Sequence, residues 1–78
     1  MNRLGVVLFH TTSAALRAEK AVLAAGLAAT LIPTPREFSS DCGIALRFDW
    51  SAAARIAALL ADAAMETAGI HELPAEGV

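Results

Sequence analysis

One residue of this chain carries an obvious nucleophile: Cys42, the single cysteine among 78 residues, within the polar segment 33–43, PTPREFSSDCG. A cysteine reacts as its thiolate, which forms where positive potential is available. Arg36 supplies a positive charge in the same segment, whereas the neighbouring Asp41 opposes the thiolate. Because these charges conflict, two interpretations stay open: a reactive thiol, or a small apolar side chain in the core.

The cysteine and histidine content gives little support for a disulfide, a metal site or a bound cofactor. A single cysteine cannot form a disulfide within the chain, which is typical of a reducing compartment. There is no Cys-x-x-Cys pair, and the two histidines, His10 and His71, lie far apart in sequence. These residues therefore predict neither a metal site nor a bound cofactor. Gly43 follows the thiol and permits close approach of the backbone beside it.

Runs of apolar residues, and the residues that interrupt them, predict the elements that position Cys42. We expect a strand, a helix, two strands, a second helix and a weak edge strand. The strands are expected at 4–9, 28–32, 43–49 and 70–73, and the first helix at 13–25. A cap at Asp49 or Ser51 should begin the second helix, and Gly69 should end it.

This order is the βαββαβ pattern of the ferredoxin-like α+β fold, in which two helices cover one face of an antiparallel four-stranded sheet. The other face is expected to be open unless a partner covers it. The first helix should begin at the hydroxyl-bearing Thr11, Thr12 and Ser13 and divide its surface between an apolar side, with Leu16 and Leu23, and a charged side.

In this topology the first and third strands are antiparallel neighbours, so His10 should lie beside Cys42 and Gly43. We expect His10 to act as a proton acceptor for the thiol. The hydroxyl groups of residues 11–13, with Gly43, form a candidate anion site at the start of the first helix.

The bulk properties limit the class of protein. A chain of 78 residues is expected to form one domain over 1–78, and a domain this small favours homo-oligomerisation through the open sheet face. The formal charge is −2 with scattered basic residues, which argues against nucleic-acid binding. We find no run of about 20 apolar residues that would span a membrane and no signal peptide, and we expect a cytoplasmic location.

Three motifs resemble a small family of bacteria and archaea, the putative selenium/sulfur carrier-like proteins. They are the step Phe9-His10, the helix segment 15–20 with Ala-x-x-x-Glu-Lys, and the segment 33–43 with Pro-x-Pro-Arg-x-x-Ser-x-x-Cys-Gly. The resemblance covers about residues 5–50, and the segment 33–43 is its specific part. It implies that Cys42 carries sulfur or selenium as a persulfide or selenosulfide, with Arg36 stabilising the anionic chalcogen.

The resemblance implies two partners, a donor protein such as a cysteine desulfurase and an acceptor enzyme. Such a carrier needs an exposed thiol. A non-covalent small-molecule-binding regulatory module and a plain protein-interaction module are the alternatives. A carrier is favoured over an enzyme that turns over a free substrate, because no carboxylate pair, nucleotide-binding glycine loop or metal-ligand cluster is evident.

Overall fold

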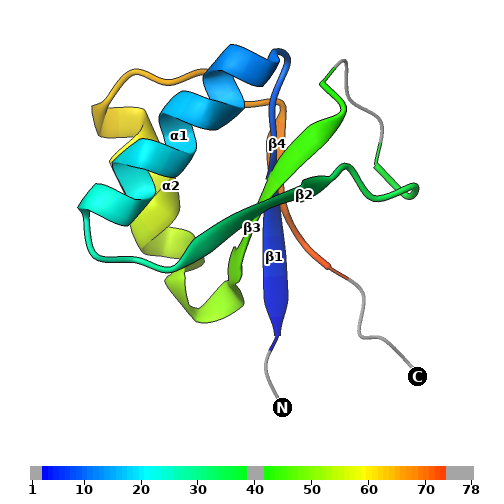
Figure 1. Cartoon of the computed structure of the whole chain (residues 1–78). Coiled ribbons are helices and arrows are strands. Elements are labelled where there is room, and N and C mark those ends of the chain that lie inside the picture. Colours follow the sequence, from blue (N-terminus) through cyan, green and yellow to red (C-terminus); the bar gives the residue numbers. More distant parts are fainter. Residues whose placement is uncertain (1–2, 39–41, 74–78) are drawn as a thin grey trace.

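Four strands and two helices follow one another in the expected order βαββαβ in the computed structural model, which describes residues 3–38 and 42–73 (Figure 1). The elements are β1 (Leu4–Leu8), α1 (Thr12–Ala24), β2 (Ala29–Pro33), β3 (Ile44–Asp49), the 3-10 turn η1 (Trp50–Ala52), α2 (Ala53–Asp62) and β4 (Gly69–Glu72). This arrangement confirms the predicted ferredoxin-like α+β fold.

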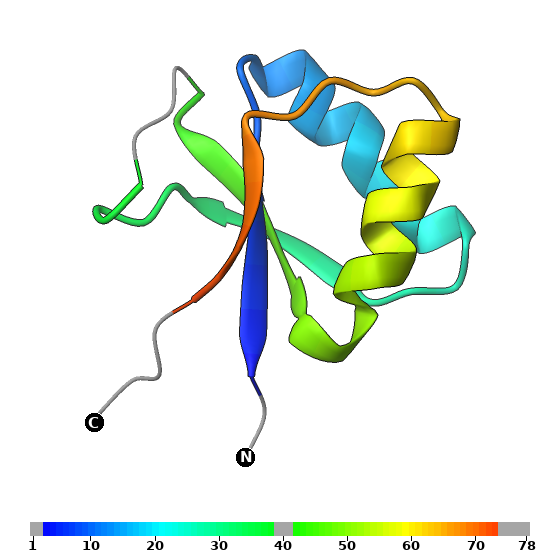
Figure 2. The ribbon, with the colours of Figure 1, turned by 180° about the vertical axis from the view of Figure 1, so that it is seen from behind.

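The strands form one antiparallel sheet with the order β2-β3-β1-β4, so that β1 and β3 are the central pair. Both helices lie on the same face of this sheet (Figures 1 and 2). Leu8 is paired with Ala45, which brings the end of β1 beside the start of β3. The end of β1 and the start of β3 therefore meet at one end of the sheet, as the topology predicts.

The main core fills the space between the sheet and the helices. It contains alternate residues of the central strands, small residues of α1 and two aliphatic residues of α2. Its buried members are Val7, Phe9, Ala15, Ala18, Val22, Cys42, Leu46, Phe48, Ile56 and Leu60. The prediction that Leu16 and Leu23 mark the packed side of α1 is wrong, because these residues are 47% and 49% exposed. Ala15, Ala18 and Val22 occupy the buried side instead, and the two alanines allow the helix to pack closely on the strands.

The second face of the sheet carries a smaller buried cluster of Val6, Leu8 and Ala45. We call these three residues the second-face cluster. Its side chains are between 0% and 3% exposed, because other parts of the chain pack against them. The packing residues are Ile32, Phe38, Ala68 and Leu73. The centre of this face is thus covered by the chain itself, so no partner is required to bury it, contrary to the expectation of an open face.

The ends of the helices differ in part from prediction. Thr11 caps α1 as expected, and Gly26 follows its end with a positive φ of 83°. Asp49 accepts a hydrogen bond from the Ser51 N–H, but it caps η1 rather than α2. Gly69 does not end α2, which stops at Asp62, and is instead the first residue of β4.

Candidate functional site

Cys42 lies at the edge of the main core, two residues before β3 begins at Ile44. Its position in sequence gives it the same alternation as the helix-facing Leu46 and Phe48, so its side chain enters the space beneath α1. The residue is 3% exposed. The side chain therefore occupies the core in this structure, whereas the carrier hypothesis needs the thiol to become exposed.

The thiol contacts the first turn of α1. Its Sγ atom lies 3.8 Å from Thr12 Oγ1, and either atom can be the donor of this weak hydrogen bond. Thr12 is the first residue of α1, and Thr11, the N-cap, accepts a hydrogen bond of 3.1 Å from the Ala14 N–H. The N-terminus of a helix carries a partial positive charge from its aligned peptide groups. The fold thus places the thiol beside one source of the positive potential that stabilises a thiolate.

Thr34 forms hydrogen bonds with the backbone of Cys42 and of the residue that follows it. Its hydroxyl donates a hydrogen bond of 3.0 Å to the carbonyl of Cys42, and its N–H donates one of 3.0 Å to the carbonyl of Gly43. These two bonds join the residue after β2 to the residues before β3. Thr34 therefore fixes both ends of the β2–β3 connection and with them the position of the thiol.

The residues predicted to serve Cys42 do not form one cluster. Thr12 contacts the thiol, whereas Thr11 and Ser13 line a groove formed with the α2–β4 connection. His10 and Gly43 are exposed at the same end of the sheet as Cys42. Arg36 is exposed in a turn closed by the Phe38 N–H and the Pro35 carbonyl. Asp41 lies outside the described residues. The predicted anion site is therefore divided between two places.

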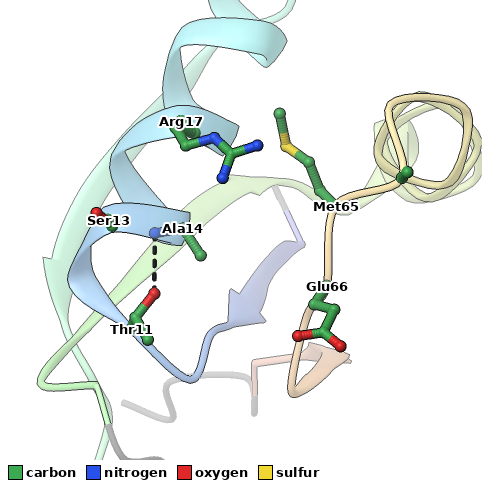
Figure 3. Close-up of a pocket in the computed structure, with 7 residues that line it drawn as sticks. Thr11, Ser13, Ala14, Arg17, Met65 and Glu66 are labelled. Atoms are coloured by element: carbon green, nitrogen blue, oxygen red, sulfur yellow. Dashed lines mark hydrogen bonds between the residues drawn. The ribbon is translucent and has the colours of Figure 1, made fainter.

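The groove on the other side of the first turn of α1 was not predicted. It has a volume of about 440 Å³ and lies between this turn and the α2–β4 connection (Figure 3). It is lined by Thr11, Ser13, Ala14, Arg17, Ala64, Met65 and Glu66. Arg17 reaches from α1 toward Met65, and Glu66 stands on the connection opposite α1 (Figure 3). Within the described part of the chain neither charged group forms an ion pair.

Phe38 and His71 form a second contact that the sequence did not indicate. Their rings stack with centroids 4.8 Å apart and an angle of 22° between the planes. The His71 ring leans over Gly69, where an added Cβ would lie 2.8 Å from His71 Nε2. Phe38 belongs to the β2–β3 connection and His71 to β4. The two residues are 33 positions apart, beyond the reach of any local sequence pattern.

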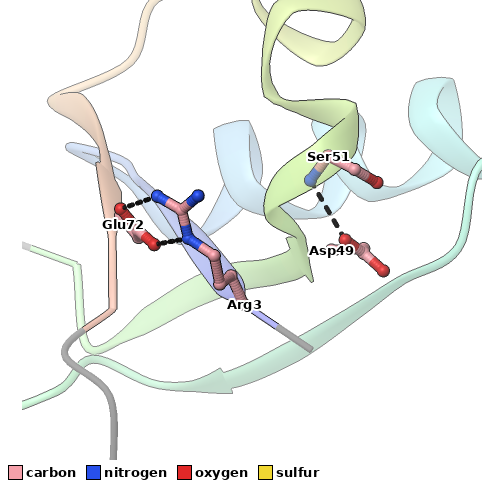
Figure 4. Close-up of polar contacts among 4 residues, drawn as sticks. All are labelled: Arg3, Asp49, Ser51 and Glu72. Atoms are coloured by element: carbon pink, nitrogen blue, oxygen red, sulfur yellow. Dashed lines mark hydrogen bonds and ion pairs between the residues drawn. The ribbon is translucent and has the colours of Figure 1, made fainter. Parts of the chain in front are cut away.

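The opposite end of the sheet carries polar contacts of structural character (Figure 4). The guanidinium of Arg3 makes a two-pronged ion pair with Glu72, in which Nη2 lies 2.7 Å from one carboxylate oxygen. The hydrogen bond from Arg3 lowers the pKa of Glu72, and the same bond raises the pKa of Arg3. Hydrogen bonds from the backbone and the side chain of Ser51 lower the pKa of Asp49. These groups stabilise the strand ends far from Cys42.

Within residues 3–38 and 42–73, no group of three or more His, Cys, Asp or Glu side chains could hold a metal ion. No helix there is both long enough and apolar enough to cross a membrane.

The fold and the site define a ferredoxin-like α+β domain with a single thiol at the N-terminal turn of its first helix. The model of the putative Se/S carrier protein-like family matches residues 4–72. The chain therefore belongs to this family, and the match includes Cys42 together with every helix and strand. Searches among curated proteins and among solved structures returned no match.

Proposed function

We propose that this protein carries sulfur or selenium as a persulfide or selenosulfide on Cys42 and passes it from a donor protein to an acceptor enzyme. The observation that carries the proposal is the family match over residues 4–72, which contain the chain's one thiol. A second cysteine would attack a persulfide and release the chalcogen by forming a disulfide. With one cysteine, the adduct cannot be lost in this way within the chain, which suits a carrier.

The transfer proceeds by exchange at the outer sulfur. The Cys42 thiolate attacks the terminal sulfur of a persulfide on the donor protein, a bond forms between the two sulfur atoms, and the donor's cysteine leaves as a thiolate. Delivery repeats this step, with a nucleophile of the acceptor attacking and Cys42 leaving. No external oxidant or reductant enters either exchange. In this proposal His10 removes the thiol proton, and Arg36 stabilises the anionic adduct.

The burial of Cys42 has two consequences for the proposed transfer: protection of the bound sulfur or selenium, and a need for the site to open. A persulfide at a site 3% exposed would be shielded from small cellular thiols that otherwise reduce it. Loading and delivery then require the segment around Cys42 to open when a partner docks. The helix N-terminus beside Thr12 would favour the anionic form during each exchange.

The test is to incubate the folded protein with a cysteine desulfurase and cysteine, and to follow the intact mass. We expect a gain of one sulfur atom that is reversed by reduction. Cys42→Ala is the matched control and should gain nothing, while His10→Ala should load more slowly. If the folded protein gains no sulfur although its denatured form reacts with a thiol reagent, the carrier function is rejected.

The groove gives a specific basis for the alternative, a non-covalent binding module. Arg17 and Glu66, which form no ion pair with any described residue, lie on opposite walls and suit a ligand with both a carboxylate and an ammonium group, such as a free amino acid. Calorimetric titration with cysteine and alanine tests this function. Cys42→Ala should bind as the wild type does, and Arg17→Ala should bind more weakly. Equal binding by the wild type and Arg17→Ala would reject it.

A further inference from the structure

We propose that the stacked pair Phe38 and His71 is a latch that holds Cys42 in its buried position from the opposite face of the sheet. The two are positioning residues, since neither has a described contact with the thiol. The inference rests on the proposed function, because it names the device that regulates access to the carrier thiol.

The first support is the distance that the β2–β3 connection spans. β2 and β4 are the two edge strands, separated by β3 and β1. Phe38 leaves the chain shortly after β2, yet its ring stacks on His71 of β4. The described part of the connection, 34–38, therefore lies on the side of the sheet opposite the helices (Figure 1). There Phe38 packs against the second-face cluster.

The second support is the chain of contacts from Phe38 to Cys42. The Phe38 N–H donates to the Pro35 carbonyl at 3.0 Å, which closes a turn next to Thr34. Thr34 in turn donates hydrogen bonds to the carbonyls of Cys42 and Gly43. When Phe38 leaves the sheet, this turn loses its anchor, and the two hydrogen bonds from Thr34 to the carbonyls of Cys42 and Gly43 lose a support. Release of the latch thus favours movement of the thiol out of the core edge.

The third support is that the latch is easier to open than the main core. His71 is exposed and Phe38 is half-buried, whereas Leu46, Phe48 and Ile56 are 0–2% exposed. Segments with few buried contacts open locally at a smaller free-energy cost than global unfolding. Access to Cys42 should therefore follow the strength of one ring pair rather than the stability of the whole domain.

The experiment measures how fast iodoacetamide labels Cys42 in the folded protein, read by intact mass. His71→Ala removes one ring from the exposed side of the stack, so the domain should still fold. We expect labelling to be faster by about threefold to tenfold, the range that an aromatic pair contributes. His71→Phe restores a ring at the same place and should return the rate to near that of the wild type.

Ile56→Val is the matched control, because it weakens the main core at α2 without touching the latch. Guanidinium unfolding should show that it destabilises the domain by an amount comparable to His71→Ala. If the latch controls access, Ile56→Val labels at the wild-type rate. Equal labelling of His71→Ala and wild type, or equal acceleration in both variants, would overturn the proposal.

Labelling by iodoacetamide does not depend on sulfur transfer. A protein whose labelling follows the latch but which gains no sulfur from a desulfurase keeps the latch and loses the carrier function. A protein that accepts sulfur at the same rate in wild type and His71→Ala, with unchanged labelling, keeps the carrier function and loses the latch. The two hypotheses therefore fail separately.

Discussion

The two faces of the sheet are buried by different means. On one face, α1 and α2 cover four strands and enclose ten buried residues, including Phe9, Phe48 and Cys42. On the other, the second-face cluster is covered by residues of connections and strand ends, among them Phe38 and Leu73. The helix-covered face should therefore determine global stability, and the second face should determine how the β2–β3 connection behaves.

This comparison also explains why the thiol is at a boundary. Cys42 belongs to the core of the helix-covered face, but the chain that leads to it runs over the second face through Phe38. A change on either face can therefore reach the thiol. Substitutions that separate the two contributions are the most informative.

The largest expected effect is that of Phe48→Ala, on the helix-covered face. Phe48 is 2% exposed and stacks on Trp50 with ring centroids 5.9 Å apart. Loss of this side chain should lower the free energy of unfolding by about 3–5 kcal/mol. Guanidinium unfolding followed by circular dichroism measures it. Phe48→Leu, which keeps much of the volume, should lose less and provides a folded variant if the alanine variant unfolds.

Leu8→Ala makes the corresponding change on the second face. Leu8 is 3% exposed, and one side of its environment is the half-buried ring of Phe38, which can move into the space. The loss of unfolding free energy should be about 2 kcal/mol, at the low end for a buried leucine. The same unfolding assay applies. A loss equal to that of Phe48→Ala would show that the two faces contribute equally to the free energy of unfolding, and would reject the claim that the helix-covered face determines global stability.

Gly5→Ala tests the packing on the helix-covered face by adding volume rather than removing it. A Cβ at this position would lie within 3 Å of ring atoms of both Phe48 and Trp50. Because Trp50 is half-buried, its ring can swing outward, so we expect a cost of about 1–2 kcal/mol. Trp50 fluorescence should shift toward that of a solvent-exposed indole. Unchanged fluorescence and stability would mean that the strand moves instead of the ring.

Much of the fold was predictable because its signals are local. The apolar run at β1 and the hydroxyl cap at Thr11 each act within a few residues. Their order then restricts the topology, and the topology places the end of β1 beside Cys42. The end of α2 was predicted wrongly. The chain leaves this helix through Ala64, which has a positive φ of 55°. Residues other than glycine rarely adopt this conformation, so an alanine in the sequence does not indicate a helix end.

The surroundings of the thiol were less predictable. The charges around Cys42 left open whether it is a reactive thiol or an apolar side chain of the core, and the alternation that leads into β3 directs it into the core. The side of α1 that faces the sheet carries Ala15, Ala18 and Val22, so the larger side chains of Leu16 and Leu23 indicated the wrong side. The pairing of Phe38 with His71 depends on how far a connection crosses the sheet. That distance is set by the assembled strands and not by either residue.

The smallest expected effect is at the polar end of the sheet and concerns pH. The pKa of Glu72 is lowered by the hydrogen bond from Arg3, so the folded state favours its carboxylate. The stability this provides is fully present above the ordinary value near 4.5 and is lost as the pH falls through the lower pKa of the folded protein. Asp49 behaves in the same way around its ordinary value near 3.8, because Ser51 lowers its pKa.

The guanidinium concentration at the midpoint of unfolding should therefore be constant from pH 7 to 6 and should decrease once the pH is lower than about 4.5. Glu72→Gln should flatten part of this fall and cost little at neutral pH, since the pair is solvent-exposed. Glu37→Gln, an exposed carboxylate outside the pair, is the control and should retain the full acid slope. Neither variant should change the labelling rate of Cys42, because both keep the stacked rings of Phe38 and His71. An altered rate in Glu72→Gln would show that β4 transmits strain from its polar end to His71.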